Sequence, residues 1–240
     1  MPRFYCPQPL SPGTHVALPP AVAHHLHVIR QQPGSILTLF NGKGGQYAAL
    51  LTEISKKHAT ARIEEFEAIE TEAPYAITLA QGLPEGSKMD WIVEKAVELG
   101  VAAIQPLAAQ RSVVRLSGER ADKRHVHWEN VVISASEQCG RNRLVHLHAL
   151  AETRPWLAEP DAGRILLSPR ATESLASWAR HTPAHAVTLL VGPEGGFTPQ
   201  EEDAAIAGGA RVFSMGPRVL RTETAGLAAL ALLAGAWGGI

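Results

Sequence analysis

The chain has 240 residues, of which 45% are hydrophobic, and its formal net charge at pH 7 is −1. The apolar fraction can fill a core and excludes intrinsic disorder, while the charge excludes nucleic-acid binding through overall charge alone. The two cysteines, Cys6 and Cys139, exclude a disulfide framework and suit a reducing cytoplasm, which is the expected location. The N-terminus lacks the apolar core of a signal peptide. The most apolar stretch, 225–240, is shorter than the ~20 residues of a membrane span, so no membrane association is expected.

Residues 1–72 are predicted to form a small β-barrel domain. Strand candidates lie at 16–18, 36–40, 47–51 and 59–63, and Asn41-Gly42 is a hairpin turn signal. A glutamate-rich segment at 64–72 and then Pro74 indicate the end of a strand and a linker, so the second domain is expected to cover 73–240.

A local charge excess is present in this first region. Residues 1–62 contain six Lys or Arg side chains and one acid, Glu53, which is a balance of +5. Such a balance is compatible with a phosphate-contacting surface or with a mildly basic solvated face, and charge alone favours the solvated face.

After Pro74 the pattern changes to alternating strands and helices, which predicts an α/β domain with a mainly parallel sheet. Ser87 to Asp90 resembles a capping box, and it precedes an amphipathic helix that ends near Gly100. A second helix is predicted from near Trp128, a third from Pro199 and a last one over the apolar C-terminal stretch. The predicted strands lie at 76–80, 101–106, 164–167, 186–191 and 211–215.

The strongest local signal is the loop GPEGGF at 192–197, which follows an apolar strand and precedes a helix. Thr198, Pro199 and Glu201 predict a capping box with proline at the first helical position. Open α/β sheets bind ligands beyond the carboxyl ends of their strands. The loop lacks the pattern of a P-loop or of a dinucleotide fingerprint, which disfavours a phosphate cradle. It is either a ligand-binding loop or a tight strand-to-helix turn.

A second loop has the same placement. GPRVLRTETA at 216–225 follows the strand at 211–215 and precedes the last helix. Two successive strands therefore end in Gly-Pro turns at one edge of the predicted sheet. Arg221 and Glu223 are either a surface ion pair of little energetic value or charges on the floor of a cleft.

Histidines cluster at 24–27, 125–127 and 146–148, and His146 and His148 would share one face of a strand. No accompanying Cys, Asp or Glu has the spacing of a metal site, so no metal is expected.

The two loops resemble the cofactor-binding motifs of the knotted SPOUT methyltransferases. More narrowly, they resemble the ribosomal RNA small subunit methyltransferase E family, which methylates N3 of a uridine in 16S rRNA. The resemblance covers nearly the whole chain, and its departures, His127 for Arg and Val145 for Pro, lie outside the cofactor motifs. Further pieces that match in order are residues 2–5, 25–30, 56–57, 88–101, 136–141 and 168–170.

The resemblance implies a trefoil-knotted SPOUT α/β domain preceded by a PUA-like β-barrel, S-adenosylmethionine as cofactor, and a homodimer. It implies 16S rRNA or the assembled small ribosomal subunit as substrate. It places the cofactor on Leu167, Gly192, Glu194, Gly195, Gly196, Met215, Gly216, Val219, Leu220, Thr224 and Ala225. The RNA contacts that we expect are Arg3, Arg30, Lys56, Lys57, Arg111 and Arg141.

Methyl transfer to uridine N3 also requires loss of the N3 proton. Arg221 is the candidate for stabilising the developing anion at O2 or O4, and Glu137 or Glu223 is the candidate proton acceptor. The sequence leaves open which carboxylate acts, and whether free rRNA or the assembled subunit is modified.

Three alternatives remain at this stage. One is a methyltransferase of the same fold that acts on a ribose 2′-OH or on guanosine. Another is a ribosome-associated RNA-binding protein without catalysis, against which the glycines at 192, 195 and 196 argue. A dinucleotide-dependent oxidoreductase is weaker, because the chain lacks GxGxxG and a ribose-binding acid.

Overall fold

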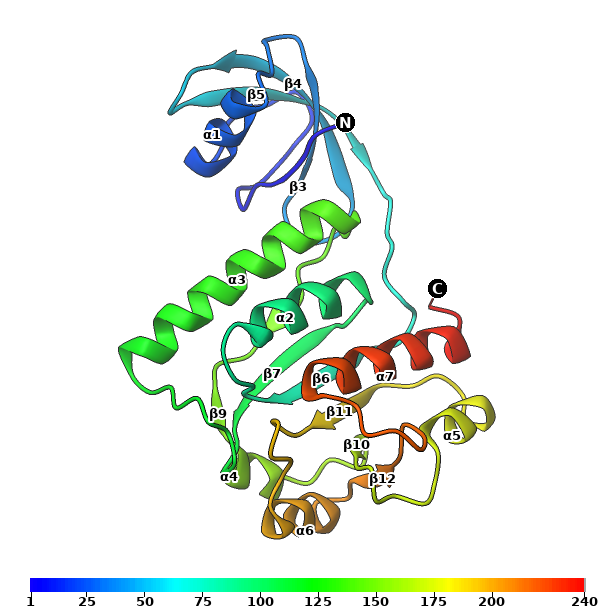
Figure 1. The fold of residues 1–240 in the computed structure, drawn as a ribbon. Coiled ribbons are helices and arrows are strands. Elements are labelled where there is room, and N and C mark those ends of the chain that lie inside the picture. The colour runs from blue at the N-terminus through cyan, green and yellow to red at the C-terminus, as the bar shows by residue number, and fades with distance from the viewer. Residues whose placement is uncertain (240) are drawn as a thin grey trace. The chain divides into compact units, whose positions relative to one another are not determined.

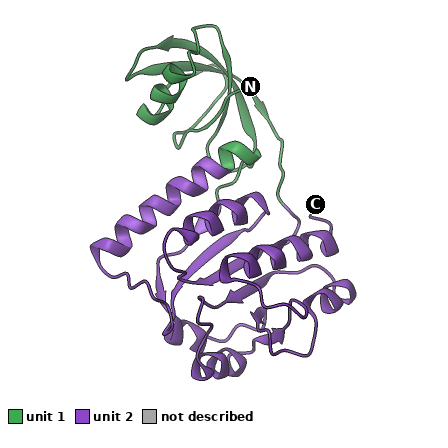
Figure 2. Ribbon diagram, viewed as in Figure 1, with its two compact units in different colours: residues 1–72, 136–144 green, residues 73–135, 145–240 purple. Residues whose placement is uncertain are grey.

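The computed structural model describes residues 1–239, and Ile240, at the end of the predicted C-terminal helix, lies outside the described residues. The chain divides into two compact units (Figure 2). The first contains residues 1–72 and also 136–144, a segment that we had expected in the second domain, and the second contains 73–135 and 145–239. No helix among residues 1–239 is both long and apolar enough to cross a membrane.

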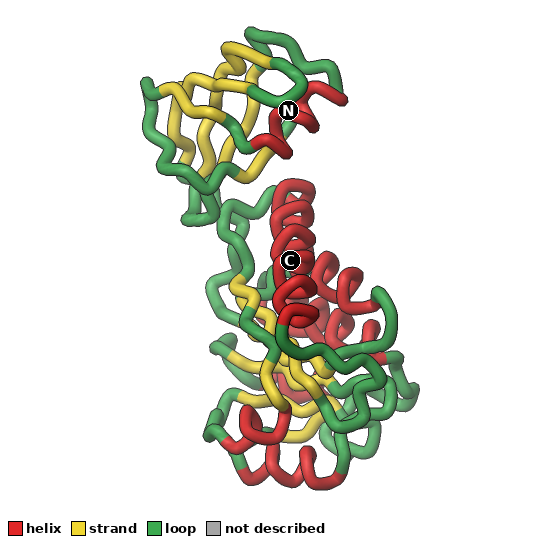
Figure 3. The backbone as a smooth tube through the Cα atoms, turned by 90° about the vertical axis from the view of Figure 1, so that its left-hand side faces the viewer, coloured by secondary structure: helices red, strands yellow, loops and turns green. Residues whose placement is uncertain are grey.

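The first unit is a five-stranded sheet with the strand order β1-β3-β4-β5-β2 and one helix, α1. Only the β1–β3 pair is parallel. The buried residues of the strands and of α1 form a single apolar core, which requires the sheet to curve around it (Figure 3). The elements are β1 (Arg3–Tyr5), β2 (His15–Ala17), α1 (Pro20–Val28), β3 (Ile36–Phe40), β4 (Gln46–Ile54) and β5 (Ala59–Glu67).

Two details of this unit differ from the expectation. Asn41 and Gly42 do not form a two-residue turn, because the β3–β4 connection runs on through Gly44 and Gly45, which also have positive φ. Helix α1 was not predicted, although Pro20 at its first turn and the buried Val22, Ala23 and Leu26 form a helical pattern.

The second unit is a seven-stranded sheet with the path β12-β10-β11-β6-β7-β8, and β9 pairs with β7. All of its strand pairs are parallel, as the sequence predicted. Its elements are β6 (Ile77–Gly82), α2 (Lys88–Glu98), β7 (Ala103–Ala108), α3 (Glu119–Cys139, whose last residues belong to the first unit), β8 (His146–Leu147), β9 (Ala151–Glu152), α4 (Thr153–Ala158), β10 (Arg164–Leu167), α5 (Leu175–His181), β11 (Val187–Val191), α6 (Pro199–Ala207), β12 (Arg211–Phe213) and α7 (Thr222–Trp237).

Helices cover both faces of this sheet, as buried parallel strands require (Figure 1). Because successive strand residues point to opposite faces, Ala80 of β6 and Leu190 of β11 pack with Leu157 of α4 and Ala205 of α6. On the other face, Leu79 and Val191 approach Gly226 of α7, and α7 packs on α2 and α5.

One helix start was predicted wrongly, and one predicted capping box is absent although its helix, α2, begins after Ser87 as expected. Helix α3 begins at Glu119, well before Trp128, because its first half is a charged, solvated helix without an apolar stripe. Ser87 makes no capping hydrogen bond. The Asp90 carboxylate, which would have completed that box, instead accepts a hydrogen bond from the Trp128 indole at 2.9 Å.

Candidate active site

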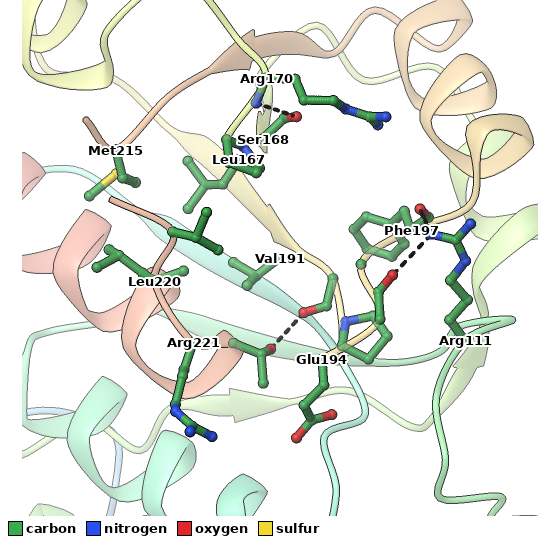
Figure 4. Close-up of a pocket in the computed structure, with 18 of the residues that line it drawn as sticks. Arg111, Leu167, Ser168, Arg170, Val191, Glu194, Phe197, Met215, Leu220 and Arg221 are labelled. Carbon is green, nitrogen blue, oxygen red and sulfur yellow. Dashed lines mark hydrogen bonds between the residues drawn. The ribbon is translucent and has the colours of Figure 1, made fainter. Parts of the chain in front are cut away.

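A cleft of about 530 Å³ opens beyond the carboxyl ends of β10, β11 and β12 (Figure 4). The parallel register brings these strand ends together, because Leu166 pairs with Leu190 and Leu167 pairs with Phe213. Clefts of roughly 300–1,000 Å³ at such strand ends are typical small-molecule sites. The side chains of Leu167, Val191 and Leu220 form an apolar centre, with Arg111 and Arg170 at its margin.

The loop after β11 is held in place from two directions. Glu194 accepts hydrogen bonds from the Lys88 ammonium at 2.6 Å and from the Glu85 amide at 3.0 Å. Burial alone would raise the pKa of Glu194, but these hydrogen bonds hold it below its usual value. The same pair raises the pKa of Lys88. On the opposite side, Arg111 donates to the carbonyl oxygens of Gly195 and Phe197 at 3.0 and 3.2 Å.

The helix that follows this loop begins as predicted. Thr198 and Glu201 form a reciprocal capping box, which is confirmed. The Glu201 carboxylate also accepts a hydrogen bond from the Gln110 amide at 2.9 Å, so it joins α6 to the segment after β7. Buried and fully bonded, Glu201 is a structural carboxylate.

The loop after β12 is much less constrained. The side chains of Arg218 and Arg221 line the cleft and make no hydrogen bond or ion pair with any of residues 1–239. Val219, between them, is 80% exposed. Arg221 does not pair with Glu223, and one carboxylate oxygen of Glu223 is buried without a hydrogen-bond partner among the described residues.

The structure brings together most of the residues expected to hold the cofactor. All of them except Thr224 line the cleft. Several lining residues were not among the predicted cofactor contacts, although Ser168, Pro169 and Arg170 follow a predicted strand whose end lies at the same edge. The strand-end rule could therefore have found them. The others are Val191, Pro193, Phe197, Glu202, Arg218 and Thr222.

Neither candidate proton acceptor lines the cleft, because Glu223 lies in the first turn of α7 beside it and Glu137 belongs to the first unit. Glu137 is occupied within that unit. Its carboxylate accepts a hydrogen bond from the Tyr5 amide at 2.8 Å. Burial raises the pKa of Glu137, and the Tyr5 hydrogen bond opposes that increase.

Two of the predicted RNA contacts are used inside the first unit. Arg141 is 5% exposed and pairs with Glu72, with 3.0 Å between its Nε and the carboxylate. Arg3 donates to Gln46 at 2.7 Å and stacks over the Phe40 ring. Both are therefore poor candidates for RNA contact. Arg30, Lys56, Lys57 and Arg111 are exposed.

No group of three or more His, Cys, Asp or Glu side chains that could hold a metal occurs in residues 1–239. His146 and His148 contact each other edge to face, with centroids 4.3 Å apart. Burial, followed by the neighbouring His146, lowers the pKa of His148.

Comparison with known proteins agrees with this architecture. Residues 71–234 match the family model of an RNA methyltransferase domain, and residues 18–64 match that of an RNA methyltransferase PUA domain. Ribosomal RNA small subunit methyltransferase E from Buchnera aphidicola is 31% identical, with 97% of this chain and 95% of the relative covered. The Bacillus subtilis protein of that name is 30% identical, with 88% and 86% covered.

Two solved structures are also similar to this chain over nearly its whole length. Ribosomal RNA small subunit methyltransferase E from Neisseria gonorrhoeae, bound to S-adenosylmethionine, is 40% identical with a TM-score of 0.91 and covers 99% of this chain and 98% of that one. A Legionella pneumophila protein in complex with the same cofactor is 35% identical with a TM-score of 0.92, and 98% of each chain is covered.

The fold, the cleft and the two family models define an RNA methyltransferase with a PUA domain. More narrowly, the chain belongs to the ribosomal RNA small subunit methyltransferase E family.

Proposed function

We propose that this protein is an S-adenosylmethionine-dependent methyltransferase that methylates N3 of a uridine in 16S rRNA of the small ribosomal subunit. Family membership over nearly the whole chain supports the activity. The single observation that carries the proposal is the cleft at the strand ends, which has an apolar centre and, on one loop, two arginines without partners among residues 1–239. Relatives that are 40% and 35% identical were solved with this cofactor bound.

The residues present fit the cofactor. A Cβ on Gly196 or Gly216 would meet nothing within 4 Å, so open space lies directly over both backbones, and both residues line the cleft. Their φ angles of +66° and +103° favour glycine, which leaves the peptide groups accessible to a ligand. Leu167, Val191 and Leu220 would cover the apolar faces of the adenosine. When bound, S-adenosylmethionine supplies a methyl group that is already activated on a sulfonium.

Arg221 is proposed to act on the uridine. Its guanidinium has no partner among residues 1–239 and points away from Leu220 and Val191 at the cleft's apolar centre (Figure 4). A planar guanidinium can donate two hydrogen bonds to a developing oxyanion at uridine O2 or O4. The absence of an Arg221–Glu223 ion pair removes the purely structural explanation for this arginine.

Glu223 is proposed to accept the N3 proton. It lies in the first turn of α7, two residues after Arg221, and it has a buried carboxylate oxygen without a partner in the described chain. Glu137 is the weaker candidate, because its carboxylate already accepts the Tyr5 amide.

The finer features of the family are also part of the proposal. We expect the C-terminal segment to thread a trefoil knot and the protein to act in the cytoplasm, on rRNA or the assembled small subunit. We also expect a homodimer, since α7 leaves Gly235 and Ala236 exposed on a helix of small and apolar residues. Light scattering should give a mass near twice the 25.7 kDa of one chain. A mass of one chain at micromolar concentration would contradict the dimer.

The decisive experiment is nucleoside mass spectrometry after incubation with labelled S-adenosylmethionine. Free 16S rRNA and assembled small subunits should be compared as substrates. Labelled 3-methyluridine is the expected product. A 2′-O-methylated nucleoside or a methylguanosine would identify a different RNA position, and binding without product would favour a protein without catalysis.

A further inference from the structure

A chain of buried polar groups lies beside the cleft. Gln81 of β6 is 0% exposed and Thr222 of α7 is 6% exposed. The Gln81 amide donates to the Gly82 carbonyl and to the Thr222 hydroxyl, both at 2.9 Å. The Thr222 hydroxyl in turn donates to the Gly192 carbonyl at 2.6 Å.

The donors and acceptors in this row of hydrogen bonds can be assigned. The Gln81 atom that faces the Gly82 carbonyl must be the amide nitrogen, because an amide oxygen there would be repelled. The hydroxyl oxygen of Thr222 therefore accepts a hydrogen bond from Gln81, and its proton is donated to the Gly192 carbonyl. The other amide atom, Oε1 of Gln81, has no hydrogen-bond partner in the described chain. Burying it costs free energy, so stability alone does not explain a glutamine at this position.

The three groups belong to three different elements. Gln81 lies at the end of β6, Gly192 follows β11, and Thr222 is the first residue of α7. β6 and β11 are adjacent, with Gln81 paired to Val191. The hydrogen bonds therefore join the start of the first cleft loop to the end of the second. We call this set of bonds among Gln81, Thr222 and Gly192 the Thr222 junction.

Arg221 depends on this junction. It is the N-cap residue of α7, and its carbonyl accepts hydrogen bonds from the Thr224 and Ala225 amides at 2.9 Å each. Its backbone therefore follows the helix start, while its side chain has no partner within residues 1–239. Gly226 of α7 packs against Val191, and the Thr222 hydroxyl adds a direct hydrogen bond from the first residue of the helix to the Gly192 loop.

We propose that Gln81 and Thr222 are positioning residues of the methyl transfer, which hold Arg221 and the Gly192 loop in one fixed relation. The inference rests on the proposed function and deepens it. Neither residue needs to touch the uridine. Misplacement of a reacting group by ~1 Å can cost on the order of 100-fold in rate, so a hydroxyl in this position has kinetic consequences.

The test compares Thr222→Val, which removes the hydroxyl at nearly constant shape, with Thr222→Ser, which retains it. Gln81→Met removes the donor from the other side and provides a second variant if Thr222→Val does not fold. The matched control is Thr188→Val, because Thr188 lies on β11 and donates to Asp161 at 3.2 Å, and it does not line the cleft. Melting temperature, the Kd for S-adenosylmethionine by calorimetry, and single-turnover methylation at saturating cofactor are measured for each variant.

Thr222→Val and Gln81→Met should slow methylation by about tenfold or more and weaken cofactor binding by about threefold or more, since buried partners lose their hydrogen bonds. Thr222→Ser should keep the methylation rate and the cofactor Kd close to those of the wild type. Thr188→Val should lower the melting temperature without changing the rate or the Kd. Equal rates and Kd values for Thr222→Val and Thr188→Val would overturn the inference. If the wild type makes no 3-methyluridine, the proposed reaction fails, and the cofactor Kd values still decide whether the junction positions the loop.

Discussion

The two cleft loops leave the same sheet edge but are held very differently. The loop at 192–197 is fixed by side chains from other parts of the second unit, notably Lys88 and Arg111. The loop at 216–221 carries Val219, at 80% exposure, and two arginines without partners in the described chain. One loop is preorganised, and the other keeps its charges available.

This difference separates two tasks. A ligand that is bound in every cycle benefits from a rigid wall, because less conformational entropy is lost on binding. A large RNA substrate is met at the rim, where free guanidinium groups can pair with phosphates or base oxygens. We therefore expect changes at the side chains that fix the first loop to alter cofactor affinity, and changes at Arg221 of the free loop to alter the reaction with RNA.

The largest effect is expected for Arg221→Ala. Loss of an oxyanion donor should lower the single-turnover rate about 100-fold, while the cofactor Kd stays within a few fold. Arg221→Lys should restore only part of the rate, because a point charge lacks the planar fork. Arg218→Ala is the control from the same loop. If Arg221→Ala weakens cofactor binding as strongly as it slows the reaction, the division of tasks between the loops is incorrect.

Charge reversal at Lys56 and Lys57 tests whether RNA binding also uses the first unit. Both lysines are exposed in the β4–β5 turn. Lys56→Glu with Lys57→Glu should weaken RNA affinity about tenfold and reduce its salt dependence, since fewer counterions are released. Filter binding at several salt concentrations measures both. Unchanged affinity and slope would mean that the turn is only a solvated face, as its charge alone suggested.

Arg111→Met should weaken cofactor binding about fivefold, because two hydrogen bonds to the fixed loop are lost. Arg115→Met is a matched control, since Arg115 also donates to two carbonyls, those of Ala109 and Gln110, but none in the loop. Calorimetry with S-adenosylmethionine separates the two variants. If Arg111→Met instead lowers RNA affinity and leaves cofactor binding unchanged, Arg111 is an RNA contact, as expected from the sequence.

The smallest effect is expected for Glu194→Gln. The pKa of Glu194 is lowered, so its contribution is present above its unfolded pKa of about 4.3 and is lost as the pH falls through the folded pKa. The pair with Lys88 is partly exposed, so solvent screening keeps its contribution to stability small. Melting curves should therefore differ slightly at pH 7 and converge below pH ~4. In a double-mutant cycle, Lys88→Met should add little to Glu194→Gln.

The sequence allowed the cleft to be located because its signals are local. Apolar strands that run into glycine-rich loops predict a ligand edge, and Thr198 and Glu201 predict the start of α6 from their spacing alone. The Thr222 junction was not predictable in this way, because Gln81 and Gly192 are distant in sequence and meet only through strand pairing. Charge was also a poor guide to exposure, since Arg3 and Arg141 were expected to contact RNA but make contacts inside the first unit.

The discontinuous first unit has a consequence for the order in which the protein can be made. Residues 136–144 complete this unit, with Asn142 donating to the Ile69 carbonyl at 2.6 Å and Arg141 pairing with Glu72. During synthesis these partners emerge only after β6, α2, β7 and most of α3 have been translated. A fragment that stops at residue 72 would lack them, so the shortest N-terminal fragment that contains every part of the first unit ends at residue 144.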